Sequence, residues 1–187
     1  MPECISNLVN RLGRTIHCLQ FAEGLNPAQW EALRFVGRAN RFSRTPSALA
    51  DYLRTTKGTA SQTVKSLEAK GLIERAPNET DRRGVLLNLT DEGRAILCRD
   101  PLRCLEKASD CLGDELETAN RLLASLIGRL EETSAQRAFG ICEDCTHFCK
   151  DLVAADCDKK DGAHQCGLTK ETLTEAERGQ ICVNYRN

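Results

Sequence analysis

The sequence predicts a mainly α-helical protein with one small β-hairpin and a cysteine-rich C-terminal segment. Apolar residues recur at helical spacing through most of residues 5–130. Two short apolar runs, residues 72–75 and 85–89, flank a stretch rich in turn-forming residues. Six of the eleven cysteines fall within residues 141–187, where large apolar residues are few. The expected fold class is therefore α+β, mainly α, with a separate role for the cysteines.

The N-terminal part is expected to form two helices. Residues 5–22 carry apolar side chains every three or four positions, which predicts an amphipathic helix. Asn26 followed by Pro27 is a typical helix start, because the asparagine side chain can accept a bond from the first turn and proline needs no acceptor there. In the second helix, we expect Trp30 to lie in the core.

Residues 46–91 read as one unit that begins with two short helices. Apolar residues at helical spacing predict the first helix around residues 49–53, and residues 55–58 interrupt the pattern. In the second helix, Ala60, Val64 and Leu67 share one side. The remaining faces carry Thr59, Ser61, Gln62, Thr63, Lys65 and Ser66. Gly71 ends this helix, since glycine adopts a left-handed cap without a Cβ penalty.

The unit ends with a hairpin whose strands are residues 72–75 and 85–89. The connecting turn is too long for a two-residue hairpin, and its tip carries Asp81, Arg82 and Arg83. Two short helices followed by a hairpin with a basic tip make a winged helix-turn-helix. In this motif the second helix suits the major groove of double-stranded DNA, and the tip can reach an adjacent groove.

This ordered set resembles the multiple-antibiotic-resistance regulator (MarR) family of dimeric bacterial transcription factors. The resemblance is carried, in chain order, by residues 25–30 with Leu33, 49–53, 61–75, 81–83 and 89–93. It implies that residues 61–65 contact base edges or phosphates, and that Arg83 enters the minor groove, held by Asp81. The complete expected DNA-binding set is Ser47, Thr59, Ser61, Gln62, Thr63, Lys65, Asp81, Arg82 and Arg83.

Charge distribution agrees with DNA binding better than the formal net charge of −1 does. Residues 40–89 hold nine Lys and Arg against five Asp and Glu, whereas residues 141–187 hold six against nine. The basic excess lies where a duplex would dock. No apolar run approaches the roughly 20 residues of a membrane span, and Met1 to Glu3 do not begin an export signal. We therefore expect a cytoplasmic protein without a membrane partner.

A helical region follows the hairpin. Thr90 offers a cap with Gly93 three residues later, and Pro101 separates that helix from the apolar-striped residues 102–130, which break at Gly113 and Asp114. The small winged helix is not large enough to cover the apolar stripes of these helices. In the MarR family, the corresponding helices pair with those of a second subunit. A homodimer on a pseudo-palindromic operator is expected. The predicted division is an N-terminal dimerisation helix (1–25), a winged helix (26–93), C-terminal dimerisation helices (94–140) and a cysteine-rich module (141–187).

Residues 141–187 bury too little apolar surface to fold unaided, so we expect a metal to hold them together. Cys142-x-x-Cys145 places two thiolates on one tight turn, where both can face one metal. Cys166-Gly167 repeats that context, and Cys182 follows a short predicted helix at residues 174–180. The favoured ligands are Cys142, Cys145, Cys166 and Cys182. The reserve ligands are Cys149, Cys157, His147 and His164.

The spacing leaves the metal open. Four irregularly spaced thiolates suit an iron–sulfur cluster slightly better than zinc, and unmetallated redox thiols are a third reading. A cluster would make the module a sensor of redox state, oxygen or iron, and zinc would make it mainly a structural clip. The other five cysteines are expected to be ordinary core or surface residues: Cys4, Cys18, Cys98, Cys104 and Cys111.

We expect no enzymatic activity, because no nucleophile is paired with a recognisable histidine motif and no phosphate-binding glycine loop is present. The favoured hypothesis is a DNA-binding regulator in which the metal site alters the packing of the terminal helices and so the spacing of the recognition helices. One alternative keeps a purely structural zinc and takes a small-molecule or thiol-oxidation signal. An alternative of another class is an iron–sulfur electron-transfer or protein-interaction module. The sequence identifies no effector.

Overall fold

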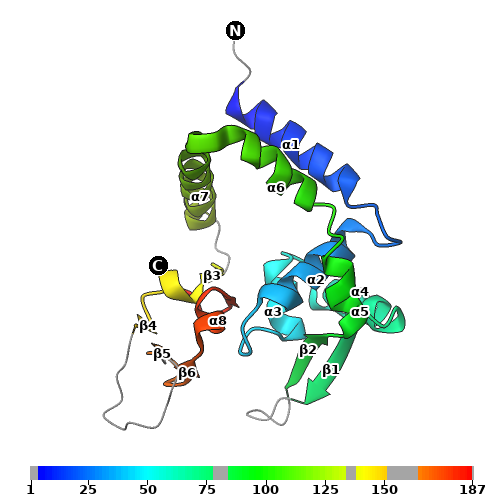
Figure 1. Cartoon of the computed structure of the whole chain (residues 1–187). Helices are drawn as coiled ribbons and strands as arrows, with labels where there is room; N and C mark the ends of the chain where they lie inside the picture. Colours follow the sequence, from blue (N-terminus) through cyan, green and yellow to red (C-terminus); the bar gives the residue numbers. More distant parts are fainter. Residues whose placement is uncertain (1–3, 78–83, 134–137, 151–163, 187) are drawn as a thin grey trace.

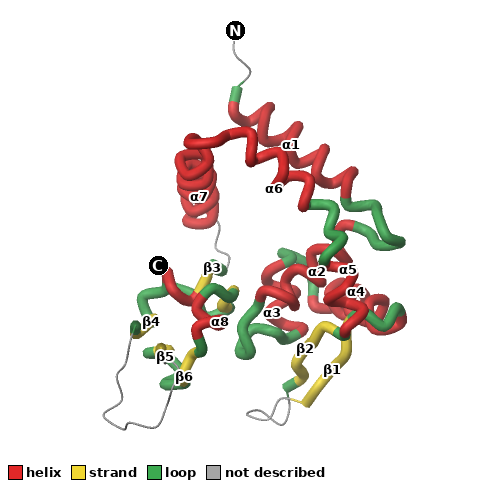
Figure 2. The backbone as a smooth tube through the Cα atoms, in the orientation of Figure 1, coloured by secondary structure: helices red, strands yellow, loops and turns green. Residues whose placement is uncertain are grey.

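The computed structural model describes residues 4–77, 84–133, 138–150 and 164–186. Its helices are α1 (Ile5–Leu19), α2 (Pro27–Arg38), α3 (Pro46–Tyr52), α4 (Lys57–Ala69), α5 (Asp91–Leu97), α6 (Arg103–Ser109), α7 (Leu116–Thr133) and α8 (Glu175–Arg178). Its strands are β1 (Ile73–Pro77), β2 (Val85–Leu89), β3 (Gly140–Ile141), β4 (Phe148–Cys149), β5 (His164–Cys166), β6 (Thr172–Leu173) and β7 (Ile181–Cys182). Short 3-10 helices are η1 (Asp110–Glu115) and η2 (Cys142–Asp144). The predicted fold class, mainly helical with a small β-hairpin, is confirmed, and the small sheets of the C-terminal part were not predicted (Figure 2).

Helices α2 to α5 and the β1–β2 hairpin surround the main core. Trp30, Leu33 and Phe35 of α2 are fully buried, as Trp30 was expected to be. They pack with Leu49 of α3 and Leu67 of α4. Fully burying an apolar side chain of this size contributes roughly 1.5–3 kcal/mol to the stability of the fold. The buried side chains of α2 therefore stabilise its packing against the neighbouring helices.

Local capping sets the start of these helices. The Asn26 side chain accepts from the Gln29 N–H at 3.0 Å, and the Gln29 side chain accepts in return from the Asn26 N–H at 3.1 Å. Thr90 Oγ1 accepts from the Gly93 N–H at 3.0 Å. At the end of α4, Gly71 adopts the expected left-handed conformation, with φ +69°. Each of these ends follows from a short sequence signal.

The hairpin is antiparallel, with Ile73 opposite Leu89 and Pro77 opposite Val85. Leu87 at its centre is fully buried and faces the main core. The predicted strand comprised residues 72–75, whereas β1 begins at Ile73 and its pairing with β2 continues to Pro77. The Leu87 N–H also donates to the Arg44 carbonyl at 2.7 Å, which fastens β2 to the segment that precedes α3.

Helices α1, α6 and α7 stand apart from the main core (Figure 1). None of their residues is buried within this chain. Large apolar side chains on α1 and α7 are exposed: Ile5, Leu8, Val9, Leu12, Leu19, Leu122, Leu123, Ile127 and Leu130. The predicted break at Gly113 is present, since this glycine has φ +51° and interrupts the helical geometry. No helix in the described ranges is both long and apolar enough to cross a membrane.

In the C-terminal extension, residues 138–186, the described segments 138–150 and 164–186 form two small sheets. Strand β3 pairs with β7, and β5 lies between β4 and β6. Helix α8 begins with a capping box at Thr174, as the predicted helix at residues 174–180 requires. The extension is attached to the main core, because Ile181 is one of the buried residues of that core and forms a parallel bridge with Ala39.

Candidate nucleic-acid interface and cysteine site

Helix α4 presents a polar face opposite its buried side. Ala60, Val64 and Leu67 are fully buried, whereas Gln62 and Lys65 are exposed. The exposed pair lies three residues apart, so both side chains share one face of the helix. On this face, the Gln62 amide can form hydrogen bonds with a base edge, and the Lys65 cation can contact a phosphate.

The other predicted residues of α4 divide between this face and the packing of the helix. Thr59 is exposed, and its hydroxyl shares a 2.9 Å hydrogen bond with the hydroxyl of Thr56. Thr63 Oγ1 donates back to the Thr59 carbonyl at 3.2 Å. Ser61 is half-buried. Ser66 faces α2, where it accepts from Gln29 Nε2 at 2.8 Å, so it positions the helix.

Ser47 is exposed on the first turn of α3. Three predicted residues of the wing tip, Asp81, Arg82 and Arg83, lie outside the described residues. The other members of the expected DNA-binding set lie on two helices, with Ser47 on α3 and the remaining residues on α4: Thr59, Ser61, Gln62, Thr63 and Lys65.

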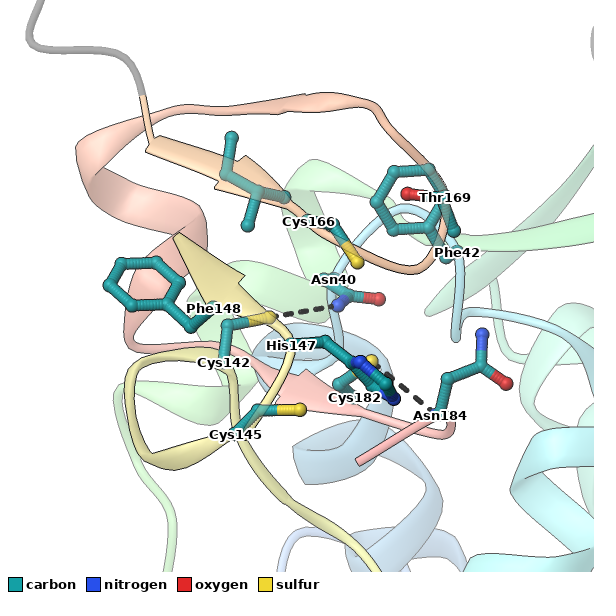
Figure 3. A pocket seen from close by; sticks show the side chains of 11 residues that line it. Asn40, Phe42, Cys142, Cys145, His147, Phe148, Cys166, Thr169, Cys182 and Asn184 are labelled. Atoms are coloured by element: carbon teal, nitrogen blue, oxygen red, sulfur yellow. Dashed lines mark hydrogen bonds between the residues drawn. The ribbon is translucent and has the colours of Figure 1, made fainter. Parts of the chain in front are cut away.

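The extension contains a cavity that all four favoured cysteines line (Figure 3). Cys142 and Cys145 come from one tight turn, closed by a 3.1 Å bond from the Cys145 N–H to the Cys142 carbonyl. Cys166 ends β5, where a second turn returns the Lys170 N–H to the Cys166 carbonyl at 2.8 Å. Cys182 ends β7. Cysteines from distant parts of the sequence thus line the same cavity, which is a condition for the predicted ligand set.

The cavity holds hydrogen-bond donors for two of the sulfur atoms. Asn40 Nδ2 donates to Cys142 Sγ at 3.3 Å, and the Asn184 N–H donates to Cys182 Sγ at 3.4 Å. Cys142 and Cys182 also share a hydrogen bond, which lowers the pKa of Cys182 to about 5 and raises the pKa of Cys142. Donors to sulfur of this kind stabilise thiolates.

Of the three reserve ligands that the structure describes, His147 alone lines the cavity. In the described part of the chain, its buried Nε2 has no hydrogen-bond partner. His164 is engaged elsewhere, since its Nε2 lies 2.8 Å from Glu175 Oε2 and its ring lies against Phe148. Cys149 is half-buried and is not part of the cavity wall, and Cys157 lies outside the described residues.

The four sulfurs share a cavity without standing at ligand distances. Within the described ranges, no group of three or more His, Cys, Asp or Glu side chains is arranged to hold a metal ion as it stands. The donor set itself suits a soft metal, because it offers four thiols, donors to two of them and a buried imidazole nitrogen. Ligation by all four sulfurs therefore needs side-chain rotation about the two turns.

Sequence reasoning did not find the residues that the winged helix contributes to this cavity. Asn40 and Phe42, from the segment between α2 and α3, line it together with Thr169, Leu173 and Asn184. An asparagine in a loop carries no local signal of burial, yet Asn40 is fully buried. Only the long-range packing of the extension brings Asn40 to Cys142.

Comparison with known proteins identifies the family. A model described as MarR family matches residues 23–84. The transcriptional repressor MprA of Escherichia coli K12 is 31% identical over 119 residues, a match that covers 59% of this chain and 67% of MprA. The HTH-type transcriptional regulator PecS of Dickeya dadantii is 33% identical over 95 residues, covering 51% of this chain and 57% of PecS. The chain belongs to the MarR family.

A solved structure extends the likeness to three dimensions. Streptococcus pneumoniae FabT, crystallised in complex with DNA, is 28% identical to this chain, with a TM-score of 0.52 over 69% of this chain and 93% of FabT. The first curated relatives are matched over only 57% and 67% of their own lengths. Membership in a family of transcription regulators confirms the expectation that this chain is not an enzyme. The family match at residues 23–84 includes Asn40 and Phe42 of the cavity wall but ends well before the four cysteines that line it.

Proposed function

We propose that this chain is a cytoplasmic, homodimeric transcription regulator that binds a pseudo-palindromic DNA site through α4. One observation carries the proposal: the exposed face with Gln62 and Lys65 on the winged helix of a MarR-family protein. Gln62 is the candidate for base readout, since glutamine pairs with adenine in the major groove. Lys65 is the candidate for phosphate contact. The exposed apolar faces of α1 and α7 support the dimer.

The experiment compares Gln62→Ala and Lys65→Ala on a duplex that the wild-type protein selects from a random pool. Gln62→Ala should lower affinity for the selected duplex and leave random DNA unaffected. Lys65→Ala should weaken both and reduce the slope of log affinity against log salt by about 1. Lys107→Ala, which removes the same charge from α6, is the control. Failure to select any duplex, or equal losses for both variants on both DNAs, contradicts the proposal.

We propose further that Cys142, Cys145, Cys166 and Cys182 bind a metal centre, either an iron–sulfur cluster or zinc. The shared cavity, the donors to Cys142 and Cys182, and the buried nitrogen of His147 support it. Zinc would cross-link the two turns and stabilise the extension, and an iron–sulfur cluster would add a redox-sensitive group. The reading in which zinc is structural and the signal is a small molecule remains the alternative within this proposal.

Metal content and visible absorption of protein purified without air distinguish these readings. Iron with sulfide and a broad brown absorption identifies an iron–sulfur cluster, and stoichiometric zinc in a colourless protein identifies a structural zinc site. Cys142→Ser should abolish metal binding. Cys149→Ser is the matched control, because Cys149 lies in the same extension but outside the cavity wall. Metal-free wild-type protein, or equal loss in both variants, contradicts the assigned ligand set.

A thiol switch is the second candidate, supported by the hydrogen bond between Cys142 and Cys182. Hydrogen peroxide would join the two sulfurs in a disulfide and be reduced to two water molecules. Mass spectrometry of metal-free protein after peroxide treatment tests it: a loss of two hydrogens, absent from Cys182→Ser, supports the switch. An unchanged mass excludes it.

A further inference from the structure

The loop between α2 and α3, residues 39–45, joins the cysteine cavity to the winged helix. Asn40 and Phe42 of this loop line the cavity. The Asn40 side chain donates to Cys142 Sγ at 3.3 Å, while its backbone N–H donates to the Ile181 carbonyl at 2.9 Å. The cavity is therefore built partly from the winged helix itself (Figure 3).

Ser43 fixes the orientation of the Asn40 amide. Its hydroxyl donates to Asn40 Oδ1 at 2.6 Å and accepts from the Val183 N–H at 2.8 Å. Both Asn40 and Ser43 are fully buried. Two residues later, Thr45 caps α3 by accepting from the Ala48 N–H at 3.1 Å. Since α3 packs against α4, a displacement at Asn40 is close in sequence and space to the DNA-binding helices.

A second contact between loop and extension lies at the surface. Arg41 donates to Glu177 Oε1 at 2.5 Å and to the Thr172 carbonyl at 2.6 Å. Its guanidinium also lies over the Phe42 ring, 4.6 Å from the centroid. Arg41 thus joins the loop to both β6 and α8 without entering the cavity.

The strength of the Asn40–Cys142 contact depends on the state of the sulfur. A metal-bound thiolate stays negatively charged and accepts a strong hydrogen bond, whereas a neutral thiol is a weak acceptor. Without a good acceptor, the fully buried Asn40 Nδ2 is left poorly satisfied, which is unfavourable. The Asn40 contact, and with it the position of the loop, therefore depends on whether Cys142 carries a metal.

We propose that Asn40 is a positioning residue that couples occupancy of the cysteine site to the DNA affinity of the winged helix, through residues 39–45. The inference rests on the metal site proposed above. It is a second route, separate from the packing of the terminal helices that the sequence led us to expect. By linkage, DNA must change metal affinity by the same factor by which metal changes DNA affinity.

The test measures DNA affinity of the full chain, metal-loaded and after chelation, on the duplex selected by the loaded wild-type protein. Loaded wild-type protein should bind more tightly, by between about 5-fold and 150-fold, the usual range for coupled sites. In Asn40→Asp, a carboxylate oxygen replaces the donor that faces Cys142, so this ratio should fall towards 1 while metal stoichiometry stays unchanged. In cobalt-substituted protein, Asn40→Asp should also shift the thiolate-to-metal absorption.

Arg41→Gln provides a variant outside the buried loop interior, in case Asn40→Asp does not fold. It should reduce the affinity ratio and leave the cobalt spectrum unchanged. Arg178→Gln is the matched control, because the described bonds of Arg178, to Glu143 and Glu175, lie within the extension. It should retain both the ratio and the spectrum.

The outcomes separate this inference from the proposed function. Metal-loaded wild-type protein that binds DNA no differently from chelated protein overturns the coupling alone. Equal reductions of the ratio in Arg41→Gln and Arg178→Gln overturn the role of the loop. Protein that binds the selected duplex but no metal overturns the metal site and, with it, the coupling. Protein that selects no duplex overturns the regulator function.

Discussion

At the scale of single residues, Arg34 ties the winged helix to the segment that leads into α6. Its guanidinium donates to both carboxylate oxygens of Asp100, at 2.6 and 2.7 Å, and to Gln20 at 2.9 Å. Both members of the ion pair are largely buried. Asp100→Asn should lower the free energy of unfolding by about 2 kcal/mol, because it weakens charge-assisted bonds at a site with little water. Urea unfolding at pH 7 measures this difference.

The same pair predicts a pH dependence. Burial opposes ionisation of Asp100, but hydrogen bonds from Arg34 and the Leu102 N–H outweigh it, so the pKa of Asp100 lies below its ordinary value. Its contribution to stability is complete above the unfolded pKa of about 3.9 and is lost as the pH falls through the lower folded pKa. The stability difference between wild type and Asp100→Asn should therefore shrink below about pH 4. A difference that is constant between pH 7 and pH 3 would contradict this reading.

The close approach of α5 to the backbone of Leu72 leaves no room for a side chain at Gly93. A Cβ at this position would lie 2.1 Å from the Leu72 carbonyl oxygen, so α5 and the segment before β1 could not keep their distance. Gly93→Ala should cost roughly 1–3 kcal/mol. Gly58→Ala is the control, since its Cβ would meet its nearest atom at 3.7 Å, and it should raise stability by up to about 1 kcal/mol. Thermal unfolding of the two variants, side by side, decides the matter.

At the scale of elements, the cap of α4 is the clearest local determinant. Thr56 Oγ1 accepts from the Thr59 N–H at 3.1 Å. Thr56→Ala should therefore cost about 1 kcal/mol, whereas Thr56→Ser, which keeps the oxygen, should cost much less. Circular dichroism during urea unfolding measures both. Equal losses would show that the Thr56 methyl group, and not the cap, stabilises the helix start.

The elements most accurately predicted from sequence are those with such short-range signals. The capping pairs at Asn26 and Thr90 and the glycine ends at Gly71 and Gly113 lie where expected, because their geometry depends on residues within a few positions. The shared turn of Cys142 and Cys145 is predictable for the same reason.

The attachment of the extension could not be predicted in this way. Asn40 meets Cys142 across 102 positions in sequence, and Ser43 meets Val183 across 140. Neither Asn40 nor Ser43 stands in an apolar pattern, so nothing local indicates that they are buried. The extension reads as a separate module in sequence, whereas in the structure its residue Ile181 completes the core of the winged helix.

At the scale of the whole molecule, the arrangement gives two routes by which a signal could reach DNA. In the proposed dimer, the exposed apolar faces of α1 and α7 would set the distance between the two recognition helices. The loop at residues 39–45 contacts the cysteine site directly. Within one subunit, Asn40 and Ser43 of that loop bond to Cys142 and Val183. The ring of Phe139, at the start of the extension, also lies against Phe35 and Tyr52 of the winged helix. A monomeric variant that keeps the metal can therefore retain a metal effect on its weak DNA binding only if the signal travels within one subunit, as the loop route does.

Such a variant follows from the exposed stripe of α7. Ile127 is 54% exposed in the single chain, and its stripe would be covered by a second subunit. Ile127→Glu places a charge in that interface, where desolvation without a partner is unfavourable, so it should produce a monomer by light scattering. DNA affinity should fall at least about 100-fold, since both half-sites can no longer be held at once. Ser125→Glu adds the same charge on the opposite side of the helix and should remain dimeric. An Ile127→Glu protein that stays dimeric would place the subunit interface elsewhere.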